Sequence, residues 1–247
     1  MSALPGTTGR RRIYLMRHGH VDYFAPEVVQ SGNTKNVVLT PQGRMEANAA
    51  GRAFATVQFD RAICSGLPRT RETAEIVLSG LESPPKLEIE PALEEIHGGR
   101  SNVRSRAELV ATVSFFFSKA ADDGATLFEG GEAFSAAQGR AVGAIERILR
   151  EPGWSQILVV AHEGINKVLL SWAAGAGLLA AHAFEQDTGC INVVDFDMVP
   201  KEDGGVGTEI ERALIKAVNL TPYNYVKHGM NLTSLEAIFA RNETGDA

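Results

Sequence analysis

The sequence predicts an α/β protein, a three-layer α/β/α sandwich built on a mainly parallel central sheet. Short apolar runs, typical of strands buried on both faces, alternate along the chain with longer segments whose apolar residues recur at helical spacing. The clearest buried strand is 157–161, an uninterrupted apolar run. This alternation is typical of parallel sheets that are covered by helices on both faces.

In the first half of the chain we predict strands over 13–16 and 61–65. Between them, Thr40 suits the N-cap of a helix and Pro41 its first position. Four residues of that helix are predicted to form its buried stripe: Met45, Ala49, Ala53 and Val57. A second helix is predicted to begin at Pro68 and to end at Gly80.

In the second half we predict a third strand within 84–90 and helices over 106–121 and 132–151. The core face of the later helix is predicted at Ala141, Ile145, Ile148 and Leu149. The strand that ends at residue 161 leads into a helix, and two late strands, 188–199 and 208–220, are expected to form an antiparallel edge pair.

The 247 residues suit one domain, which we expect to span 1–247. Within it we expect a flexible tail at 1–12, a cap-like insertion at 97–134 and a C-terminal tail at 220–247, a candidate contact surface for a homodimer. A net charge of −6 gives no reason to expect nucleic-acid binding. Two cysteines make no disulfide framework and no apolar run approaches a membrane span, so we expect a cytoplasmic protein without a membrane partner.

Polar residues follow the predicted strands where each one ends. Arg17 and His18 follow the first strand, 65–69 the second, 94–97 the third, and His162 the fourth. Because ligands of such sheets bind beyond the carboxyl ends of the strands, we expect these residues to share one site.

The residue types at that edge suit phosphoryl transfer. An imidazole such as His18 attacks phosphorus when one ring nitrogen is unprotonated, and the backbone carbonyl in the turn at Gly19 is a candidate acceptor for the other nitrogen. The forked donors of Arg17 and Arg69 can bind phosphoryl oxygens without a metal, and His162 can add another contact. The leaving alkoxide needs a proton from a carboxylic acid, for which Glu95 is the first candidate and Glu163 the second.

Five segments resemble the histidine phosphatase superfamily, phosphoglycerate mutase-like branch, in the order in which that family carries them: LMRHGH, SGLPRTRETA, LEEIHGG, EGGEAFSAAQGR and VVAHEG. They span about residues 13–195. The resemblance implies a phosphoglycerate mutase-like fold, a phosphohistidine intermediate on His18 and a phosphoryl group held by Arg17, Arg69 and His162. It places the proton donor at Glu95.

The sequence departs from the family pattern at points that concern the substrate. His20 stands where relatives often carry Glu or Gln, and 21–40 lacks the usual Asn…Arg-x-Gly pattern. The segment with Arg100, Arg104 and Arg106 is too short and dissimilar to resemble the mutases' phosphate clamp, so hydrolysis is favoured. Glu163 directly after the second histidine is typical of the phytase branch, but the start of that branch is missing here, which favours Glu95.

We therefore expect a metal-independent phosphatase that acts on a small phosphate monoester and needs no cofactor. Its expected catalytic residues are His18, Glu95, His162, Arg17 and Arg69, and its expected substrate contacts are Arg17, Arg69, His162, His20 and Glu163. Two alternatives stay open: a phosphoglycerate-type mutase, and a non-catalytic phosphate-binding regulatory module on the same scaffold.

Overall fold

The computed structural model describes residues 8–31, 33–100, 108, 112, 115–201 and 207–240. Within these residues one six-stranded sheet has the order β3-β2-β4-β1-β5-β6. Its strands are β1 (Gly9–Arg17), β2 (Arg61–Cys64), β3 (Leu87–Ile89), β4 (Gln156–Ala161), β5 (Ile191–Pro200) and β6 (Thr208–Leu220). The first four in spatial order are parallel, whereas β5 and β6 are paired antiparallel. The predicted parallel sheet and its antiparallel edge are confirmed.

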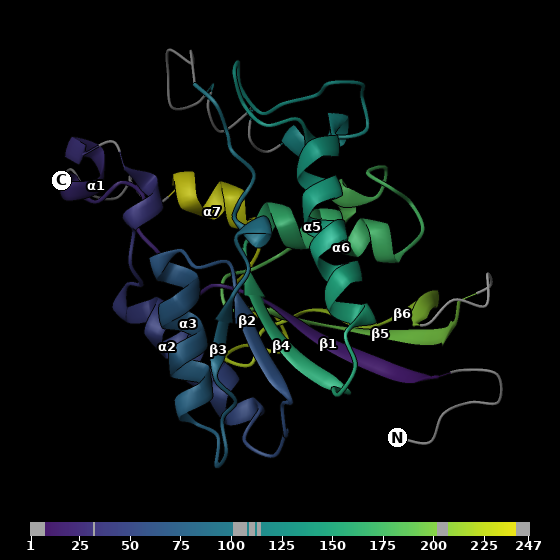
Figure 1. The fold of residues 1–247 in the computed structure, drawn as a ribbon. Coiled ribbons are helices and arrows are strands. Elements are labelled where there is room, and N and C mark those ends of the chain that lie inside the picture. The colour runs from purple at the N-terminus through teal and green to yellow at the C-terminus, as the bar shows by residue number, and fades with distance from the viewer. Residues whose placement is uncertain are drawn as a thin grey trace.

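Helices cover both faces of the sheet (Figure 1). On one side lie α2 (Pro41–Ala53) and α3 (Pro68–Ser79), and on the other α5 (Phe134–Arg150) and α6 (Glu163–Ala173). This arrangement confirms the three-layer sandwich. Shorter helices are α1 (Pro26–Ser31), α7 (Ser234–Ala240) and the 3-10 turns η1 (Thr34–Asn36), η2 (Pro91–Leu93), η3 (Phe116–Lys119) and η4 (Ala181–Ala183).

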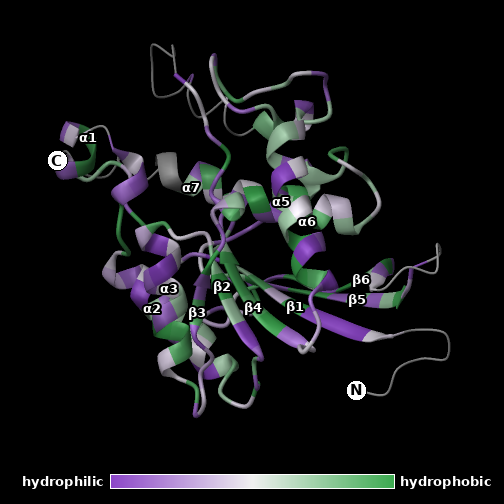
Figure 2. Ribbon diagram, in the orientation of Figure 1, coloured by the Kyte–Doolittle hydropathy of each residue, from purple (hydrophilic) through white to green (hydrophobic). Residues whose placement is uncertain are grey.

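Strand β4 shows why the central strands are apolar throughout. Ile157, Val159 and Ala161 pack in one hydrophobic cluster with α5 and α6, whereas Leu158 and Val160 pack in a second cluster with α2 and α3. Successive side chains of a strand point to opposite faces, so a strand between two helical layers needs apolar residues at every position. Strand β4 is accordingly green over most of its length in Figure 2.

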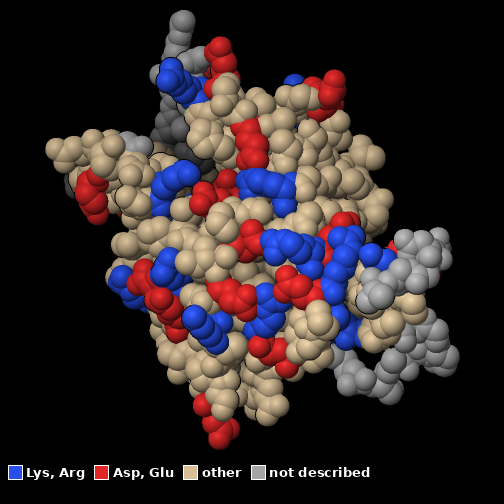
Figure 3. Space-filling view, in the orientation of Figure 1, with Lys and Arg blue, Asp and Glu red and all other residues tan. Residues whose placement is uncertain are grey.

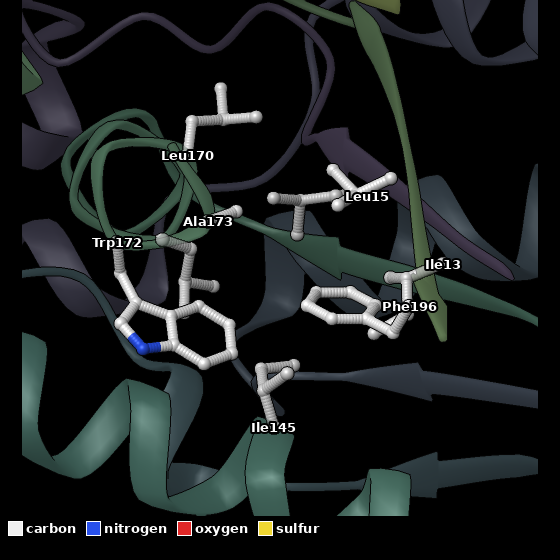
Figure 4. Close-up of a pocket in the computed structure, with 9 residues that line it drawn as sticks. Ile13, Leu15, Ile145, Leu170, Trp172, Ala173 and Phe196 are labelled. Atoms are coloured by element: carbon white, nitrogen blue, oxygen red, sulfur yellow. The ribbon is translucent and has the colours of Figure 1, made fainter. Parts of the chain in front are cut away.

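Figure 4 shows a pocket in the layer between the sheet and α5 and α6. Its lining is apolar and comes from both helices and from β1 and β5, and the rings of Trp172 and Phe196 stack there with centroids 5.7 Å apart. None of its lining residues carries a charge that would bind a phosphate. We interpret this pocket as imperfect packing within the core.

The N-terminal tail is shorter than predicted. Residues 9–12, expected in a flexible tail, are the first part of β1. Arg10 pairs with Asp197 at 2.7 Å and Arg12 with Asp195 at 2.6 Å, both carboxylates belonging to β5. Arg10 and Arg12 are therefore the cross-strand partners of buried aspartates.

The cap of α2 is confirmed, but of its predicted buried stripe only Ala49 is fully buried. Thr40 accepts a hydrogen bond from the backbone N–H of Gly43 at 3.2 Å, and Pro41 occupies the first turn. Met45 is 57% exposed, whereas Glu46 is fully buried. The buried face of α2 is rotated about the helix axis relative to the predicted stripe, because it includes the carboxylate of Glu46.

The insertion at 97–134 and the tail at 220–247 are described in part. The predicted helix over 106–121 falls mostly outside the described residues, and its end is the 3-10 turn η3. Backbone hydrogen bonds from Phe128 to Gly98 and from Glu132 to His97 hold the ends of the insertion together. In the tail, α7 lies beside the strand end that carries Arg17, since Arg17 donates a hydrogen bond to the Ser234 hydroxyl.

On the face drawn in Figure 3, basic and acidic side chains are interleaved over the surface. A search of the described residues for a helix long and apolar enough to cross a bilayer finds none. The same residues contain no group of three or more His, Cys, Asp or Glu arranged to hold a metal ion.

Candidate active site

The ends of β1 and β4 place two histidines side by side. The two strands are parallel neighbours with Arg17 opposite Ala161, so the next residues, His18 and His162, meet beyond the sheet. Their rings lie edge to face with centroids 5.3 Å apart, and both side chains are buried. Sequence reasoning predicted this meeting from the strand ends alone.

The hydrogen bonds of His18 fix its tautomer. Its Nδ1 lies 2.7 Å from the carbonyl oxygen of Gly19. A carbonyl only accepts, so Nδ1 carries the proton and Nε2 of the neutral ring has a free lone pair. Burial, followed by the positive charges of Arg69 and Arg17, lowers the pKa of His18 well below its usual value. The ring is thus held in the neutral, nucleophilic form, with the acceptor that the sequence suggested.

Backbone contacts hold the loop that carries His18. Its N–H donates to the Ala161 carbonyl at 3.1 Å and its carbonyl accepts from Gly189 at 3.0 Å. A Cβ atom on Gly19 would lie 2.4 Å from the carbonyl oxygen of Gly43, so no side chain fits between this loop and the start of α2. Glycine is required at position 19 by close backbone approach.

Buried Glu46 ties the same loop to the rest of the site, which the sequence analysis missed. Its Oε2 accepts from the backbone N–H of His20 at 2.8 Å, and its Oε1 accepts from the Thr188 hydroxyl at 3.0 Å and from Gln42 at 2.8 Å. The signal that the sequence offers for Glu46 is an acidic residue within the predicted helix, three positions after Gly43. Hydropathy alone predicts that such a residue lies on the solvent face.

Arg17 and Arg69 are both buried and lie beside the two histidines. Nη1 of Arg17 donates to the Gln186 carbonyl at 2.5 Å and lies 3.1 Å from Oε2 of Glu163. Nη1 of Arg69 makes long hydrogen bonds of 3.3 and 3.4 Å to two carbonyls in η1, and its guanidinium lies 5.9 Å from the ring centroid of Tyr23. In each arginine the buried Nε has no partner among the described residues.

A short hydrogen-bond relay fixes the tautomer of His162. The Thr70 hydroxyl donates to the Leu67 carbonyl at 2.9 Å, so the 2.9 Å contact between Thr70 and Ser65 must be donated by Ser65. Ser65 then has no proton left for Nε2 of His162, 2.8 Å away, and Nε2 must be the donor. The other nitrogen, Nδ1, is buried without a partner among the described residues. Burial first, and then Arg69 and His18, lower the pKa of His162 well below its usual value.

We call Arg17, His18, Arg69 and His162 the phosphoryl pocket. Each of these residues follows the end of a parallel strand, directly or by way of the first turn of α3. Nε of Arg17 and Nε of Arg69 are donors without a partner among the described residues, whereas Nδ1 of His162 and Nε2 of His18 carry lone pairs. The two guanidinium groups suit an anion with several oxygens.

The two candidate acids have different surroundings. Glu95 accepts from the backbone N–H of Ile96 at 2.9 Å and of Gly164 at 3.1 Å, and burial raises its pKa. Both oxygens of Glu163 lie 3.1 Å from a cation, one from Arg17 and the other from Lys167. A carboxylate held in two ion pairs is an acceptor, so the geometry favours Glu95 as the proton donor and gives Glu163 a role in fixing Arg17.

His20 lies apart from the other predicted site residues. Its Nδ1 is 2.8 Å from the Thr40 hydroxyl, and its side chain lines a second cavity with Asp187, Thr188 and Tyr223. The cavity that contains His18 is lined by the other predicted residues except Arg69 and His162, which lie beside it. Of the loop arginines, Arg100 is exposed, while Arg104 and Arg106 lie outside the described residues.

The family model described as Histidine phosphatase superfamily (branch 1) matches residues 13–200, which contain the whole phosphoryl pocket. The chain belongs to the histidine phosphatase superfamily. Two relatives illustrate the range of its similarity. One is adenosylcobalamin/alpha-ribazole phosphatase of Escherichia coli (strain K12), 29% identical over 75% of this chain and 90% of that protein. The other is 2-carboxy-D-arabinitol-1-phosphatase of Triticum aestivum, 27% identical over 80% of this chain and 39% of that protein.

Several solved structures share the fold of the chain. Mycobacterial hydrolase 2 has a TM-score of 0.68 at 18% identity and covers 94% of this chain and 97% of its own. The alpha-ribazole phosphatase from Shigella flexneri has a TM-score of 0.61 at 24% identity, covering 84% and 96%. Family membership and the named phosphatases among the relatives confirm the prediction of a phosphoric monoester hydrolase.

Proposed function

We propose that this superfamily member hydrolyses a small phosphate monoester through a phosphohistidine on His18. In the first half-reaction the lone pair on Nε2 attacks phosphorus, the bond from phosphorus to the ester oxygen breaks, and Glu95 gives its proton to the departing alkoxide. In the second, Glu95 takes a proton from water, the hydroxide attacks phosphorus, and the bond between nitrogen and phosphorus breaks to release inorganic phosphate.

The observation that carries this proposal is the set of buried, partnerless nitrogens around an unprotonated His18 Nε2. Arg17 and Arg69 supply permanent positive charge to the phosphoryl oxygens, which serves in place of a metal ion. The negative charge of a phosphoryl group favours the imidazolium form of His162, in which Nδ1 becomes a donor. The raised pKa of Glu95 supports its role, because a general acid must hold its proton near the working pH.

The setting of the reaction is part of the proposal. Cys64 and Cys190 are both buried free thiols, which supports a cytoplasmic, reducing environment. The mixed charge of the surface in Figure 3 supports a small molecule as the partner, rather than a nucleic acid.

The test is trapping of the intermediate. Wild-type protein denatured in alkaline detergent, in which a phosphohistidine is stable, should carry one phosphoryl group on His18 during turnover of p-nitrophenyl phosphate. His18→Ala should abolish both the label and the release of phosphate, whereas His228→Ala, at an exposed histidine, should leave both unchanged. Full activity of the His18→Ala variant would reject the mechanism.

One further measurement separates hydrolysis from the alternatives. A mutase would need a bisphosphate primer and would move the phosphoryl group without releasing inorganic phosphate. We expect release of phosphate without a primer. A binding module would release none from any monoester.

A further inference from the structure

A cavity opens directly beside His18, and most of its wall is apolar. Arg17, His18, Glu95 and Glu163 line it together with Gly164. The rest of the wall, which we call the apolar wall, consists of Tyr23, Ile96, Phe116, Phe117, Leu127 and Leu235. A substrate with its phosphoryl group in the phosphoryl pocket and its ester oxygen near Glu95 can place its leaving group against this wall.

The cations beside the polar residues of this lining each lie near a carboxylate. Arg17 is paired with Glu163 at 3.1 Å, and Lys167 lies 3.1 Å from the same carboxylate and 4.0 Å from that of Glu185. The Lys167 ammonium lies 4.9 Å from the ring centroid of Phe117 and is itself buried, so the aromatic ring is one of its neighbours. Among the described residues that line this cavity, no cation is left for a second anionic group on the substrate.

Another cavity, different from the one lined by His20, adjoins the first across Tyr23, Glu95 and Ile96, and its lining is polar. Of its basic residues, Arg69 belongs to the phosphoryl pocket, Lys35 pairs with Glu94 at 3.2 Å, and Arg140 pairs with Glu132 at 2.6 Å. Apart from Arg69, the described arginines and lysines of this lining are therefore each paired with a carboxylate, which disfavours a carboxylate or a second phosphate on the substrate.

The apolar wall is anchored in the fold. Phe116 and Phe117 form an aromatic cluster with Phe134 of α5, with ring centroids 4.5–5.3 Å apart. Leu235 is in α7, next to Ser234, whose hydroxyl accepts from Arg17 and whose N–H donates to Glu185 at 2.8 Å. Rigid aromatic and aliphatic walls favour ligands with apolar surface to bury.

We propose that the leaving group of the substrate is an uncharged and largely apolar alcohol, aromatic or branched aliphatic, which packs on Phe116, Leu127 and Leu235. The inference rests on the proposed function, because it takes the phosphoryl group to be bound beside His18. It adds the substrate class, which the phosphoryl pocket itself does not determine.

The test compares three monoesters of alcohols that leave with similar difficulty. We expect kcat/KM for benzyl phosphate to exceed that for glycerol 1-phosphate and for 3-phosphoglycerate by at least about tenfold, the effect of burying roughly half of a large apolar side chain. A wild-type protein that turns over either polar ester as well as benzyl phosphate, with dependence on His18 intact, overturns this inference and leaves the proposed function standing. Absence of any His18-dependent turnover overturns both.

Matched leucine variants locate the effect. Leu127→Ser should lower kcat/KM for benzyl phosphate about tenfold and change that for glycerol 1-phosphate less than twofold, and Leu127→Lys should raise the relative rate on 3-phosphoglycerate. Leu127 is partly exposed on a loop, so these variants should fold, as circular dichroism can verify. Leu179, which is 71% exposed and lines none of these cavities, supplies the Ser and Lys controls. Equal effects at positions 127 and 179 would reject the apolar wall as the specificity element.

Discussion

The phosphoryl pocket and the apolar wall lie side by side but are built differently. The pocket residues follow the ends of parallel strands and are held by backbone hydrogen bonds and by the Ser65–Thr70 relay. The wall comes from three loops, from η3 and from α7, segments that are far apart in the chain. A sheet edge positions polar atoms within tenths of an ångström, whereas loops vary readily. In the proposed reaction, the residues that bind and attack the phosphoryl group therefore belong to a different part of the fold from the residues that contact the leaving group.

The pocket histidines and Glu95 have pKa shifts of opposite sign. In the phosphoryl pocket, burial and the two arginines lower the pKa of His18 and His162 and favour the neutral rings. Burial raises the pKa of Glu95, which lines the same cavity as His18. Shifts in these two directions are the pattern expected for a nucleophile and a general acid.

The largest expected effect distinguishes the role of Glu95 from that of the phosphoryl pocket. Glu95→Gln removes the proposed proton donor, so kcat for benzyl phosphate should fall about 10²–10⁴-fold. For p-nitrophenyl phosphate, whose leaving group needs no proton, the loss should stay within about tenfold. Steady-state rates over a series of leaving groups measure the difference.

Glu163→Gln is the matched comparison for that variant. It removes a partner of Arg17, so both substrates should slow by the same factor. If the leaving-group dependence appeared in Glu163→Gln instead, the two acids would have to exchange roles.

A smaller effect is expected at Gly164, at the start of α6. A Cβ there would lie 2.6 Å from Oε1 of Glu95 and 3.0 Å from the Ile96 side chain. Gly164→Ala should therefore displace the acid and slow turnover of benzyl phosphate by about tenfold, a typical cost of misplacing a catalytic group. Gly139→Ala in α5, where a Cβ meets nothing within 4 Å, should retain activity and gain up to about 1 kcal/mol of stability. Full activity in both variants would show that α6 tolerates a side chain at position 164.

The smallest expected effect is on stability, and it directly tests the opposite pKa shifts of the two histidines and of Glu95. The folded state holds His18 and His162 with lowered pKa values, so the unfolded chain binds more protons below about pH 6.5. The free energy of unfolding should fall as the pH falls, by about 1 kcal/mol per pH unit for each histidine. His162→Asn should remove one such contribution, as urea titrations in phosphate-free buffer between pH 7.5 and 5.5 can measure.

Glu95 should act in the other direction. Its folded pKa is raised, so its contribution to stability is present at acidic pH and is lost as the pH rises through that pKa. The stability of Glu95→Gln relative to wild type should therefore increase with pH above the usual range of a carboxyl group. A constant difference at all pH values would mean that Glu95 titrates normally.

Much of the fold could be predicted because local signals and tertiary packing agree. The core face of α5 is buried as predicted, at Ala141, Ile145, Ile148 and Leu149. The sequence analysis failed where a polar group is buried for a tertiary reason. Glu46 lies on the buried face of α2 because the His20 backbone and the Thr188 hydroxyl supply its hydrogen-bond partners. With this face turned inward, the neighbouring Met45 is exposed. Residues 9–12 could not be recognised as part of a strand, because the aspartates that pair with Arg10 and Arg12 are nearly two hundred positions away in the chain.

By itself, the order of strands, helices and polar strand ends determined the α/β sandwich and predicted that Arg17, His18 and His162 would lie at one edge. This was possible because neighbouring parallel strands bring their ends together whatever the loops contain. Only the tertiary structure decided that the Gly19 carbonyl accepts from His18 and that Glu163 pairs with Arg17. It also decided that His20 lines another cavity, and that Leu127 and Leu235 line the same cavity as Phe116. Those contacts join residues of distant segments, and no periodicity or spacing encodes which distant segments will touch.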